Sequence, residues 1–431
     1  MRMKRVIYVA ILLCTTLAAM WLLPALVRKA TYTGNDYPFV YYGAVLQGFG
    51  LIDYTDKEFP LTDLQGNRYS PPQFDSLMPL LNFRQLMSDG RLPDSLGGYE
   101  LSPLLLRTST VIFRHSPSDW QFAPPLHVLF ESMPKRVGLE LPPDMFRLHN
   151  GIEFIDAASN RTDTEKSMRF NQAFDKAGFR FPAVWAAGNP TPRKPYDEGY
   201  FVLDSAGNLF HLKMVNGRPY VRDTRLGDSI DILRFDMYES YDKRFYGFLF
   251  DRQGGLYIVE SDDNGGYRPL RLDMDNMDPS TDRITVMGNL LYWTVTIDTP
   301  AGRRYYALES STLQRVDEHF IARTPDRWER TARLLFPCYM ATDDWSGASM
   351  APTMLFTGFA ALPVNIVAAV AIFLLAAGSP GRRSALAAYV LLTGICGLLA
   401  VMLLPGLRPS TGPRSAGNRS DTTINQTDKT K

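Results

Sequence analysis

The sequence predicts a mainly β protein, in which propeller-like repeats of short antiparallel strands are combined with three transmembrane α-helices and a short helical insertion. Two observations support this expectation. Aspartate and glycine recur between strand-like runs with a period of 47 or 48 residues, which is about the length of a propeller blade. Three long apolar segments, one near the N-terminus and two near the C-terminus, predict the membrane helices.

The first apolar segment follows a short basic stretch, residues 1–5, which we expect to be cytoplasmic. Residues 6–27 carry no charge over the ~20 residues that a bilayer-spanning helix needs. A cleavable signal peptide is the alternative, but its apolar region is shorter and ends in small residues. Here the apolar run continues through Trp21 and Leu22, so we expect a transmembrane helix over 6–27.

Two further apolar segments, residues 354–377 and 385–407, are separated by GSPGRRS and predict a hairpin of two transmembrane helices. Asn365 falls in mid-span and is expected to hydrogen-bond across the helix pair, with a transport role as the alternative. Two or three spanning helices are too few to form a pore, so a role in conduction would require the protein to oligomerise. The tail at 408–431 is rich in Ser, Thr, Gly and Asn, so we expect it to be disordered.

Basic residues flank the predicted spans in equal numbers on the two sides, so their count does not decide the orientation. The first helix usually dominates topology. We therefore expect an integral protein of the bacterial inner membrane, whose large domain between the first and second spans lies in the periplasm.

The repeats are marked by an aspartate that ends one strand-like run and a glycine that precedes the next. An aspartate side chain accepts hydrogen bonds from amides just ahead of it, and glycine adopts positive φ without steric cost. The pairs therefore predict structural turns between strands, with a poorer copy at Asp156. The residues of these turns are Asp204 and Gly207, Asp251 and Gly254, and Asp298 and Gly302.

A second mark, Asn-Gly at 216–217 and again at 264–265, predicts type I′ hairpins. The string DxxGxLY or DxxGxLF resembles the blade signature of propellers of the two-component-regulator type, and the resemblance covers residues 148–320. A closed ring would use the strand at 38–45 to complete a blade from late in the chain. Stacked sheets or an open β-sandwich are the alternative.

A helical insertion interrupts residues 30–147, the first part of the large domain. Ser70, Pro71 and Gln73 have the order of an N-cap, a first helical residue and a capping-box partner. We expect a helix over 71–89, which Pro79 must kink or split. A second helix is expected at 325–336, capped by Thr324, within a helical connector at 321–350.

The run NRYSPPQFDSLMPLLNFRQLMSDGRLPDS, residues 67–95, is similar to the hallmark of an uncharacterised bacterial family of membrane-anchored proteins with a domain of unknown function. Members of that family tend to be encoded beside ABC-type transporter subunits. The resemblance implies such subunits as partners, besides the lipid bilayer. Because the family has no established activity, it implies no catalytic residue.

Little else in the chain indicates chemistry. A net charge of +1 argues against a nucleic-acid partner, and the five histidines and three cysteines lack metal-ligand or disulfide spacing. Asp273, Asp275 and Asp278 match a calcium loop only in part. No nucleophile elbow, P-loop or Rossmann fingerprint occurs. We therefore predict no catalytic residue, no metal and no cofactor.

The best polar constellation surrounds the end of the first predicted helix. Exposed charge near helix ends is ordinary, so the favoured interpretation is the polar face of a helix with its terminal ion pairs. A contact with a partner subunit is the functional alternative. The residues are Arg84, Gln85, Asp89, Arg91 and Asp94.

These features favour a membrane-anchored, extracytoplasmic binding or adaptor protein, accessory to an ABC-type transport system. The alternative is a membrane-bound hydrolase or lyase that acts on a saccharide or lipid in a central channel. Convergent carboxylates or a histidine–carboxylate pair in an open pocket would favour the enzyme.

Overall fold

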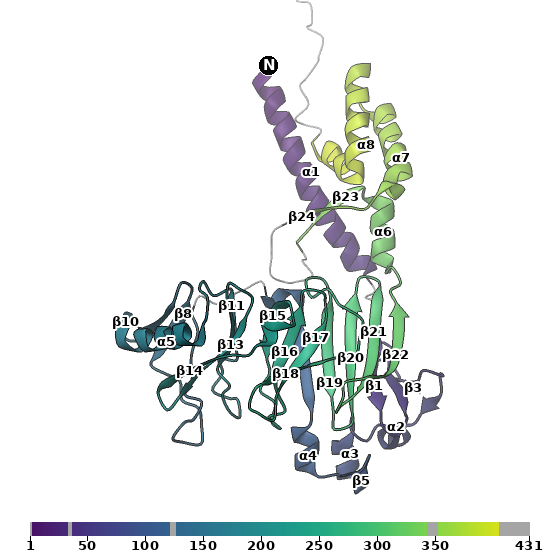
Figure 1. The fold of residues 1–431 in the computed structure, drawn as a ribbon. Coiled ribbons are helices and arrows are strands. Elements are labelled where there is room, and N and C mark those ends of the chain that lie inside the picture. The colour runs from purple at the N-terminus through teal and green to yellow at the C-terminus, as the bar shows by residue number, and fades with distance from the viewer. Residues whose placement is uncertain (1, 33–36, 121–125, 343–351, 405–431) are drawn as a thin grey trace, which may run out of the picture. The chain divides into compact units, whose positions relative to one another are not determined.

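The computed structural model describes residues 2–32, 37–120, 126–342 and 352–404 (Figure 1). The predicted disordered tail at 408–431 lies outside the described residues. The chain folds into two compact units, which we call the helical unit and the sheet unit. The helical unit comprises Met1–Gly34, Pro325–Asp343 and Met350–Lys431, and the sheet unit comprises Asn35–Thr324 and Asp344–Ser349.

The helical unit contains four α-helices and a two-stranded hairpin among its described residues. Two helices are long and apolar enough to cross a membrane, over Val6–Thr31 and Pro380–Leu403. The elements are α1 (Arg2–Thr31), α6 (Arg327–Leu335), β23 (Cys338–Ala341), β24 (Thr353–Phe356), η3 (Phe359–Ala361), α7 (Leu362–Leu375) and α8 (Pro380–Leu403).

The prediction of three transmembrane helices is wrong for the described residues, which contain two candidate spans. The segment expected to span at 354–377 begins instead as a strand, because Thr353–Phe356 pairs with β23. The helix that follows, α7, has 14 residues and is therefore about 21 Å long. This is shorter than the ~30 Å hydrocarbon core of a bilayer.

The helix α8 starts five residues before the expected span at 385–407, and it is interrupted at Gly394. This glycine has φ 63° and ψ −146°, a conformation essentially restricted to glycine. Asn365 of α7 is buried beside the interruption, and its Nδ2 donates a hydrogen bond to the Leu391 carbonyl at 3.2 Å. Asn365 thus satisfies one of the carbonyls that the interruption leaves without a helical partner.

The connector helix α6 begins later than expected. Asp326, not Thr324, is its N-cap, and the Asp326 side chain accepts a hydrogen bond from the Glu329 amide at 2.6 Å. A carboxylate is the better cap because it also interacts favourably with the positive end of the helix dipole.

The sheet unit consists mainly of antiparallel sheets, each built almost entirely from consecutive strands (Figure 1). The first sheet contains β1 (Phe39–Gly43), β2 (Gly48–Ile52), β3 (Leu61–Asp63) and β4 (Arg68–Tyr69). The second contains β8 (Asp144–Leu148), β9 (Ile152–Asp156) and β10 (Arg161–Asp163). The third contains β11 (Trp185–Gly188), β12 (Tyr200–Leu203), β13 (Leu209–Val215) and β14 (Arg218–Asp223).

Two further sheets and a small hairpin complete the unit. The fourth sheet contains β15 (Ile232–Met237), β16 (Phe245–Asp251), β17 (Leu256–Ser261) and β18 (Tyr267–Arg271). The fifth contains β19 (Arg283–Gly288), β20 (Tyr292–Thr299), β21 (Gly302–Glu309), β22 (Arg315–Ala322) and β7 (Val111–His115). The hairpin pairs β5 (Ser95–Leu96) with β6 (Tyr99–Glu100).

Neighbouring sheets share aromatic-rich cores. One core joins the second sheet to the third, a further core joins the third to the fourth, and another joins the fourth to the fifth. The first sheet packs on the fifth through Tyr42, Phe49 and Tyr305. The second and first sheets lie at opposite ends of this row (Figure 1). The described residues therefore form an open row of stacked sheets and no closed ring.

The strand that completes the late sheet is not the expected one. Residues 38–45 contribute β1, which starts a sheet of its own, whereas β7 pairs antiparallel with β19 from Val111 opposite Gly288 to His115 opposite Ile284. The strand β1 still meets the late sheet, because the Tyr42 amide donates a hydrogen bond to the Thr294 hydroxyl at 2.9 Å.

The short helices of the sheet unit lie between strands. Pro79 falls between α2 and α3, so the helix expected over 71–89 is two helices. Gln73 Oε1 accepts a hydrogen bond from the Ser70 amide at 3.0 Å. The helices are α2 (Pro71–Leu77), α3 (Phe83–Ser88), α4 (Pro103–Thr108), η1 (Pro117–Trp120), α5 (Thr164–Ala177) and η2 (Leu226–Asp228).

Candidate functional site

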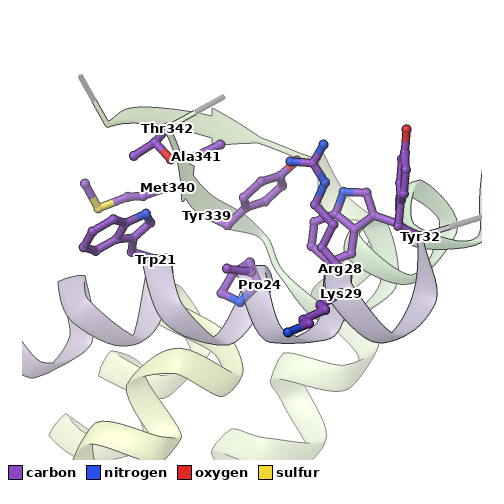
Figure 2. Close-up of a pocket in the computed structure, with 11 residues that line it drawn as sticks. Trp21, Pro24, Arg28, Lys29, Tyr32, Tyr339, Met340, Ala341 and Thr342 are labelled. Atoms are coloured by element: carbon purple, nitrogen blue, oxygen red, sulfur yellow. The ribbon is translucent and has the colours of Figure 1, made fainter. Parts of the chain in front are cut away.

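A cavity of about 470 Å³ lies within the helical unit, between the end of α1 and the strand β23 (Figure 2). The helix α1 contributes Trp21 and Pro24 to it, besides its last basic residues. The connector helix α6 contributes Trp328, and β23 contributes Tyr339 and Met340. A cavity of this volume is in the range that holds small-molecule ligands.

The walls of this cavity are rich in aromatic rings. Trp21 of α1 and Tyr32, which follows α1, are exposed, whereas Trp328 is buried and Tyr339 is half-buried. The rings of Trp328 and Tyr339 meet edge to face, with centroids 5.6 Å apart. Tryptophan and tyrosine present an apolar body and a polar tip, which suits them to ligands or surroundings that are part apolar and part wet.

Two of the residues that line this cavity, Arg28 and Lys29, are basic, and none is acidic. The Arg28 side chain rises from α1 toward Tyr339 (Figure 2), and its guanidinium lies 5.4 Å from the centre of the Tyr32 ring. Burial raises the pKa of Tyr339, Arg28 opposes this rise, and Glu329 and Asp326 add to it. Acidic groups therefore approach Tyr339, but outside the residues that form the cavity wall.

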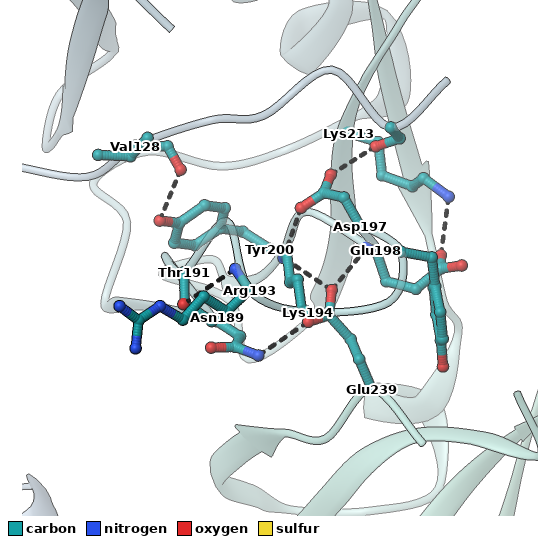
Figure 3. Close-up of polar contacts among 12 residues, drawn as sticks. Val128, Asn189, Thr191, Arg193, Lys194, Asp197, Glu198, Tyr200, Lys213 and Glu239 are labelled. Atoms are coloured by element: carbon teal, nitrogen blue, oxygen red, sulfur yellow. Dashed lines mark hydrogen bonds and ion pairs between the residues drawn. The ribbon is translucent and has the colours of Figure 1, made fainter. Parts of the chain in front are cut away.

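A second polar constellation lies inside the sheet unit, where Lys194 joins two carboxylates (Figure 3). Its Nζ is 2.6 Å from Asp197 Oδ1 and 2.8 Å from Glu239 Oε1. The three side chains are only 3%, 2% and 1% exposed, respectively. Burial raises the pKa of Glu239, and its bonds to Lys194 oppose the rise.

The remaining carboxylate oxygens of this cluster are also satisfied. Asp197 Oδ2 accepts a hydrogen bond from the Ser132 hydroxyl at 2.6 Å, and Glu239 Oε2 accepts one from Asn189 Nδ2 at 2.9 Å. Because Glu239 follows β15 while Lys194 and Asp197 precede β12, the cluster fastens the third sheet to the fourth. Buried and fully paired in this way, it is a structural element.

The five residues expected to contact a partner are all exposed, and the structure joins three of them. Gln85 Nε2 donates to Asp89 Oδ1 at 2.8 Å, and Arg91 lies 3.3 Å from Asp89 Oδ2. Arg91 also donates to the Pro72 carbonyl at 2.5 Å, so this group ties α3 to α2. Arg84 contacts the neighbouring Phe83 ring, and the Asp94 carbonyl accepts from the Leu101 amide at 2.8 Å.

Two of the three predicted turns have the same geometry. The amides of Asp204 and Asp251 donate to the carbonyls of Asn208 and Gly255, four residues ahead. Each aspartate Oδ1 accepts a hydrogen bond back from the amide of that same residue. Gly207 and Gly254 have φ of 87° and 92°.

The third turn differs from the expectation. Asp298 lies within β20 and forms an ion pair with Arg303, directly opposite on β21. Thr299 makes the turn instead, by accepting a hydrogen bond from the Ala301 amide at 3.3 Å. The spacing explains the change, because Gly302 follows Asp298 by four positions, whereas Gly207 follows Asp204 by three.

The aspartates that resemble a calcium loop make other contacts. Asp275 pairs with Arg304, Arg315 lies near Asp273 and Asp275, and Asp278 accepts a hydrogen bond from the Ser280 amide. Within the described parts of the chain, no group of three or more His, Cys, Asp or Glu side chains is placed to hold a metal ion.

The residues of the cavity were not predicted as a site. The run from Trp21 to Tyr32 does carry a signal, since tryptophan, tyrosine and basic residues at the end of an apolar helix are typical of a membrane interface. The other wall comes from Trp328 and Tyr339, which are far away in the sequence. Their approach to α1 depends on tertiary packing.

This fold defines a class of protein in which a mainly β unit is joined to a helical unit. The helical unit contains two apolar helices of membrane-spanning length among its described residues. A family model described as a domain of unknown function (DUF4857) matches residues 39–308. This match covers more than half of the chain, so the chain belongs to that family. The motif at 67–95 lies inside the matched region.

A search of curated proteins found no match. Among solved structures, the chain is similar to one described as "Dihydro-heme d1 dehydrogenase NirN in complex with DHE". The two share 11% sequence identity, and the match covers 59% of this chain and 75% of that chain with a TM-score of 0.19. A TM-score this low supports no conclusion about fold or function.

Proposed function

We propose that this protein is a membrane-anchored binding or adaptor protein of the bacterial inner membrane, with its sheet unit in the periplasm. One observation carries this proposal. The first helix and the last helices fold together, since Leu12 of α1 packs with Val390 and Ala400 of α8. The hydroxyls of Thr16 and Tyr389 also lie 2.6 Å apart. The sheet unit is thus inserted between two parts of one apolar helical unit.

We further propose that the adaptor serves an ABC-type transport system. The support for this partner is the resemblance of residues 67–95 to a family encoded beside transporter subunits. That motif forms α2 and α3, and it leaves Arg84 exposed on the surface of the sheet unit.

A binding role is favoured over the alternative of a hydrolase or lyase. Asp197 and Glu239 are convergent carboxylates, but their side chains are 2% and 1% exposed. His211 is also buried, with hydrogen bonds to Tyr267 and Glu198. A substrate has no access to either group, so neither supplies the open acid–base pair that the enzyme would need.

Affinity purification tests the proposed role. Full-length protein with an affinity tag is purified from native membranes in mild detergent, and co-purifying proteins are identified by mass spectrometry. We expect nucleotide-binding and membrane subunits of an ABC-type transporter, and recovery of this protein when a transporter subunit carries the tag. Failure to recover the partner in both directions would contradict the transporter association.

A further inference from the structure

We propose that the cavity between α1 and β23 binds the phosphodiester headgroup of an anionic phospholipid, such as phosphatidylglycerol. The proposal rests on the membrane anchoring proposed above and is independent of the transporter partner. It follows from the position of the cavity along α1, its charge and the composition of its walls.

The position of the cavity matches the level of lipid headgroups. The apolar span at Val6–Thr31 ends at the cavity, and one wall of the cavity runs from Trp21 of α1 to Tyr32, directly after the helix. Tryptophan and tyrosine concentrate where the hydrocarbon of a bilayer meets the headgroups, and Lys and Arg side chains reach toward that interface. A cavity with this wall opens where phosphate groups lie.

The charge of the cavity suits a phosphodiester. Arg28 and Lys29 are the charged residues of its wall. A guanidinium can donate two parallel hydrogen bonds to a phosphate, and an ammonium acts as a compact positive charge beside it. These two groups therefore suit a phosphodiester, which carries one negative charge.

The walls suit the rest of a lipid. Pro24 and Met340 add apolar surface to the aromatic rings of Trp21 and Trp328, against which the glycerol backbone and the first methylenes of an acyl chain can pack. Tyr32 and Tyr339 supply hydroxyl groups at the same cavity. The volume of about 470 Å³ accommodates a headgroup with the start of its chains.

Native mass spectrometry of the full-length protein tests this proposal. Delipidated protein in detergent is titrated with phosphatidylglycerol, and the Arg28→Gln/Lys29→Gln double variant is compared with Arg382→Gln/Arg383→Gln, which removes two charges at the start of α8. We expect the first double variant to bind about tenfold more weakly, since each basic residue near a membrane surface contributes substantially to anionic lipid binding. The control should bind like the wild type.

The single variant Lys29→Gln separates a loss of binding from misfolding, because Lys29 is exposed and its replacement should not disturb the fold. We expect it to retain the wild-type melting temperature and to bind phosphatidylglycerol about threefold more weakly.

Three results would overturn the proposal. Equal losses in both double variants would indicate general surface attraction, and no loss in either would remove the cavity as the site. Equal or tighter binding of phosphatidylethanolamine would exclude an anionic lipid as the preferred occupant. Equal binding of soluble glycerol 3-phosphate would assign the phosphate site to a metabolite. Extraction of native membranes with carbonate separately tests anchoring: release of the protein would contradict the proposed function itself.

Discussion

Asp204 is a fully buried carboxylate that holds its turn together through backbone amides. Its Oδ1 accepts hydrogen bonds from the amides of Ala206 and Asn208 at 2.9 and 2.8 Å, and its Oδ2 accepts one from the Arg180 amide at 3.2 Å. Without the carboxylate each of these amides would lose its protein partner, and the loss of hydrogen bonds to a charged group is destabilising.

We therefore expect Asp204→Ala to lower the free energy of unfolding by about 3 kcal/mol. Asp298→Ala is the matched control, because Asp298 is 30% exposed and its ion pair with Arg303 is worth about 1 kcal/mol or less. Urea unfolding of the full-length protein, followed by near-ultraviolet circular dichroism, measures both effects. Equal losses in the two variants would contradict a special role for the Asp204 turn.

His211 makes the stability of the sheet unit depend on pH. Its Nε2 lies 2.6 Å from the Glu198 carbonyl, which can only accept, so Nδ1 is left to accept from the Tyr267 hydroxyl at 2.7 Å. Burial lowers the pKa of His211 to about 3. The folded protein therefore keeps this histidine neutral at pH values where the unfolded chain, with a pKa near 6.5, takes up a proton.

Because the unfolded state binds more protons between pH 6.5 and 3, the stability contributed by neutral His211 is lost as the pH falls through this window. At pH 5 the loss relative to pH 7.5 is about 2 kcal/mol. In His211→Phe this part of the pH dependence should disappear, although the variant is less stable at every pH because Tyr267 and Glu198 lose a partner. Urea midpoints at both pH values measure the difference, and equal pH slopes would contradict the assignment.

The geometry of a turn could be predicted from the sequence where all of its interacting residues lie close together in the chain. Asp204 and Asp251 were recognisable because an aspartate, its amide donors and a glycine all lie within five residues. Asp298 was misread because one additional residue moves the side chain into the strand. His211 carried no such signal, since its partner Tyr267 is 56 residues away.

At the scale of elements, α2 and α3 present one residue suited to a partner and one that is needed for structure. Arg91 joins the two helices through the Pro72 carbonyl and the Ser76 hydroxyl. Arg84 is exposed, and its guanidinium lies over the adjacent Phe83 ring. The two arginines therefore separate the two interpretations of the cluster.

We expect Arg84→Ala to leave the melting temperature unchanged and to reduce the recovery of transporter subunits at least threefold. Arg91→Ala should lower the stability of the protein by about 1 kcal/mol, because exposed charged pairs contribute on this scale. Quantitative mass spectrometry of affinity-purified variants measures recovery, and differential scanning fluorimetry measures stability. Wild-type recovery with Arg84→Ala would leave the cluster as a structural feature.

The interruption of α8 is a second element with a clear consequence. A Cβ at Gly394 would lie 2.8 Å from Asn365 Oδ1 and 2.9 Å from Pro337 Cδ. The backbone there also has φ 63° and ψ −146°, which strains any residue with a side chain. Gly394→Ala should therefore destabilise the helical unit by about 2–3 kcal/mol.

Gly381 supplies the control, because a Cβ at this position in α8 meets no other atom within 4 Å. Gly381→Ala should be neutral or slightly stabilising, since alanine favours a helix over glycine by up to about 1 kcal/mol. Thermal unfolding in detergent, followed by circular dichroism at 222 nm, compares the two variants. Equal melting temperatures would mean that α8 can straighten at Gly394 without loss.

Some elements were predictable and others were not. The separation of α2 from α3 was predictable from Pro79, because the proline ring removes the backbone amide donor and clashes with the preceding helical turn. The helix α5 was missed although its signals are local: Asp163 caps it by accepting from the Lys166 amide, and Gly178 ends it with φ 83°. The prediction of propeller-like repeats over 148–320 left no place for a helix in this segment. No local pattern could pair β7 with β19, because strand register between distant segments depends on tertiary packing.

At the scale of the whole molecule, the sequence indicated a large β region between apolar segments but not how the apolar segments meet. The cavity illustrates why. Arg28 and Tyr339 approach each other only because α1 packs with α6 and β23 around Met20, Trp328 and Phe336. Composition reveals that such residues are apolar or aromatic, but it does not reveal which of them become neighbours.

The placement of the two units across the membrane gives the last prediction. If the N-terminus of α1 is cytoplasmic and the sheet unit is periplasmic, Asp263→Cys, in the exposed hairpin between β17 and β18, should react in intact cells with a maleimide that crosses the outer membrane but not the inner. Met3→Cys, at the other end of α1, should react only after the inner membrane is permeabilised. Wild-type protein sets the background, because Cys338 and Cys396 are buried and Cys14 lies within the apolar span. The reverse pattern would place the sheet unit in the cytoplasm, and the aromatic and basic wall of the cavity would then face the lipids of the inner leaflet.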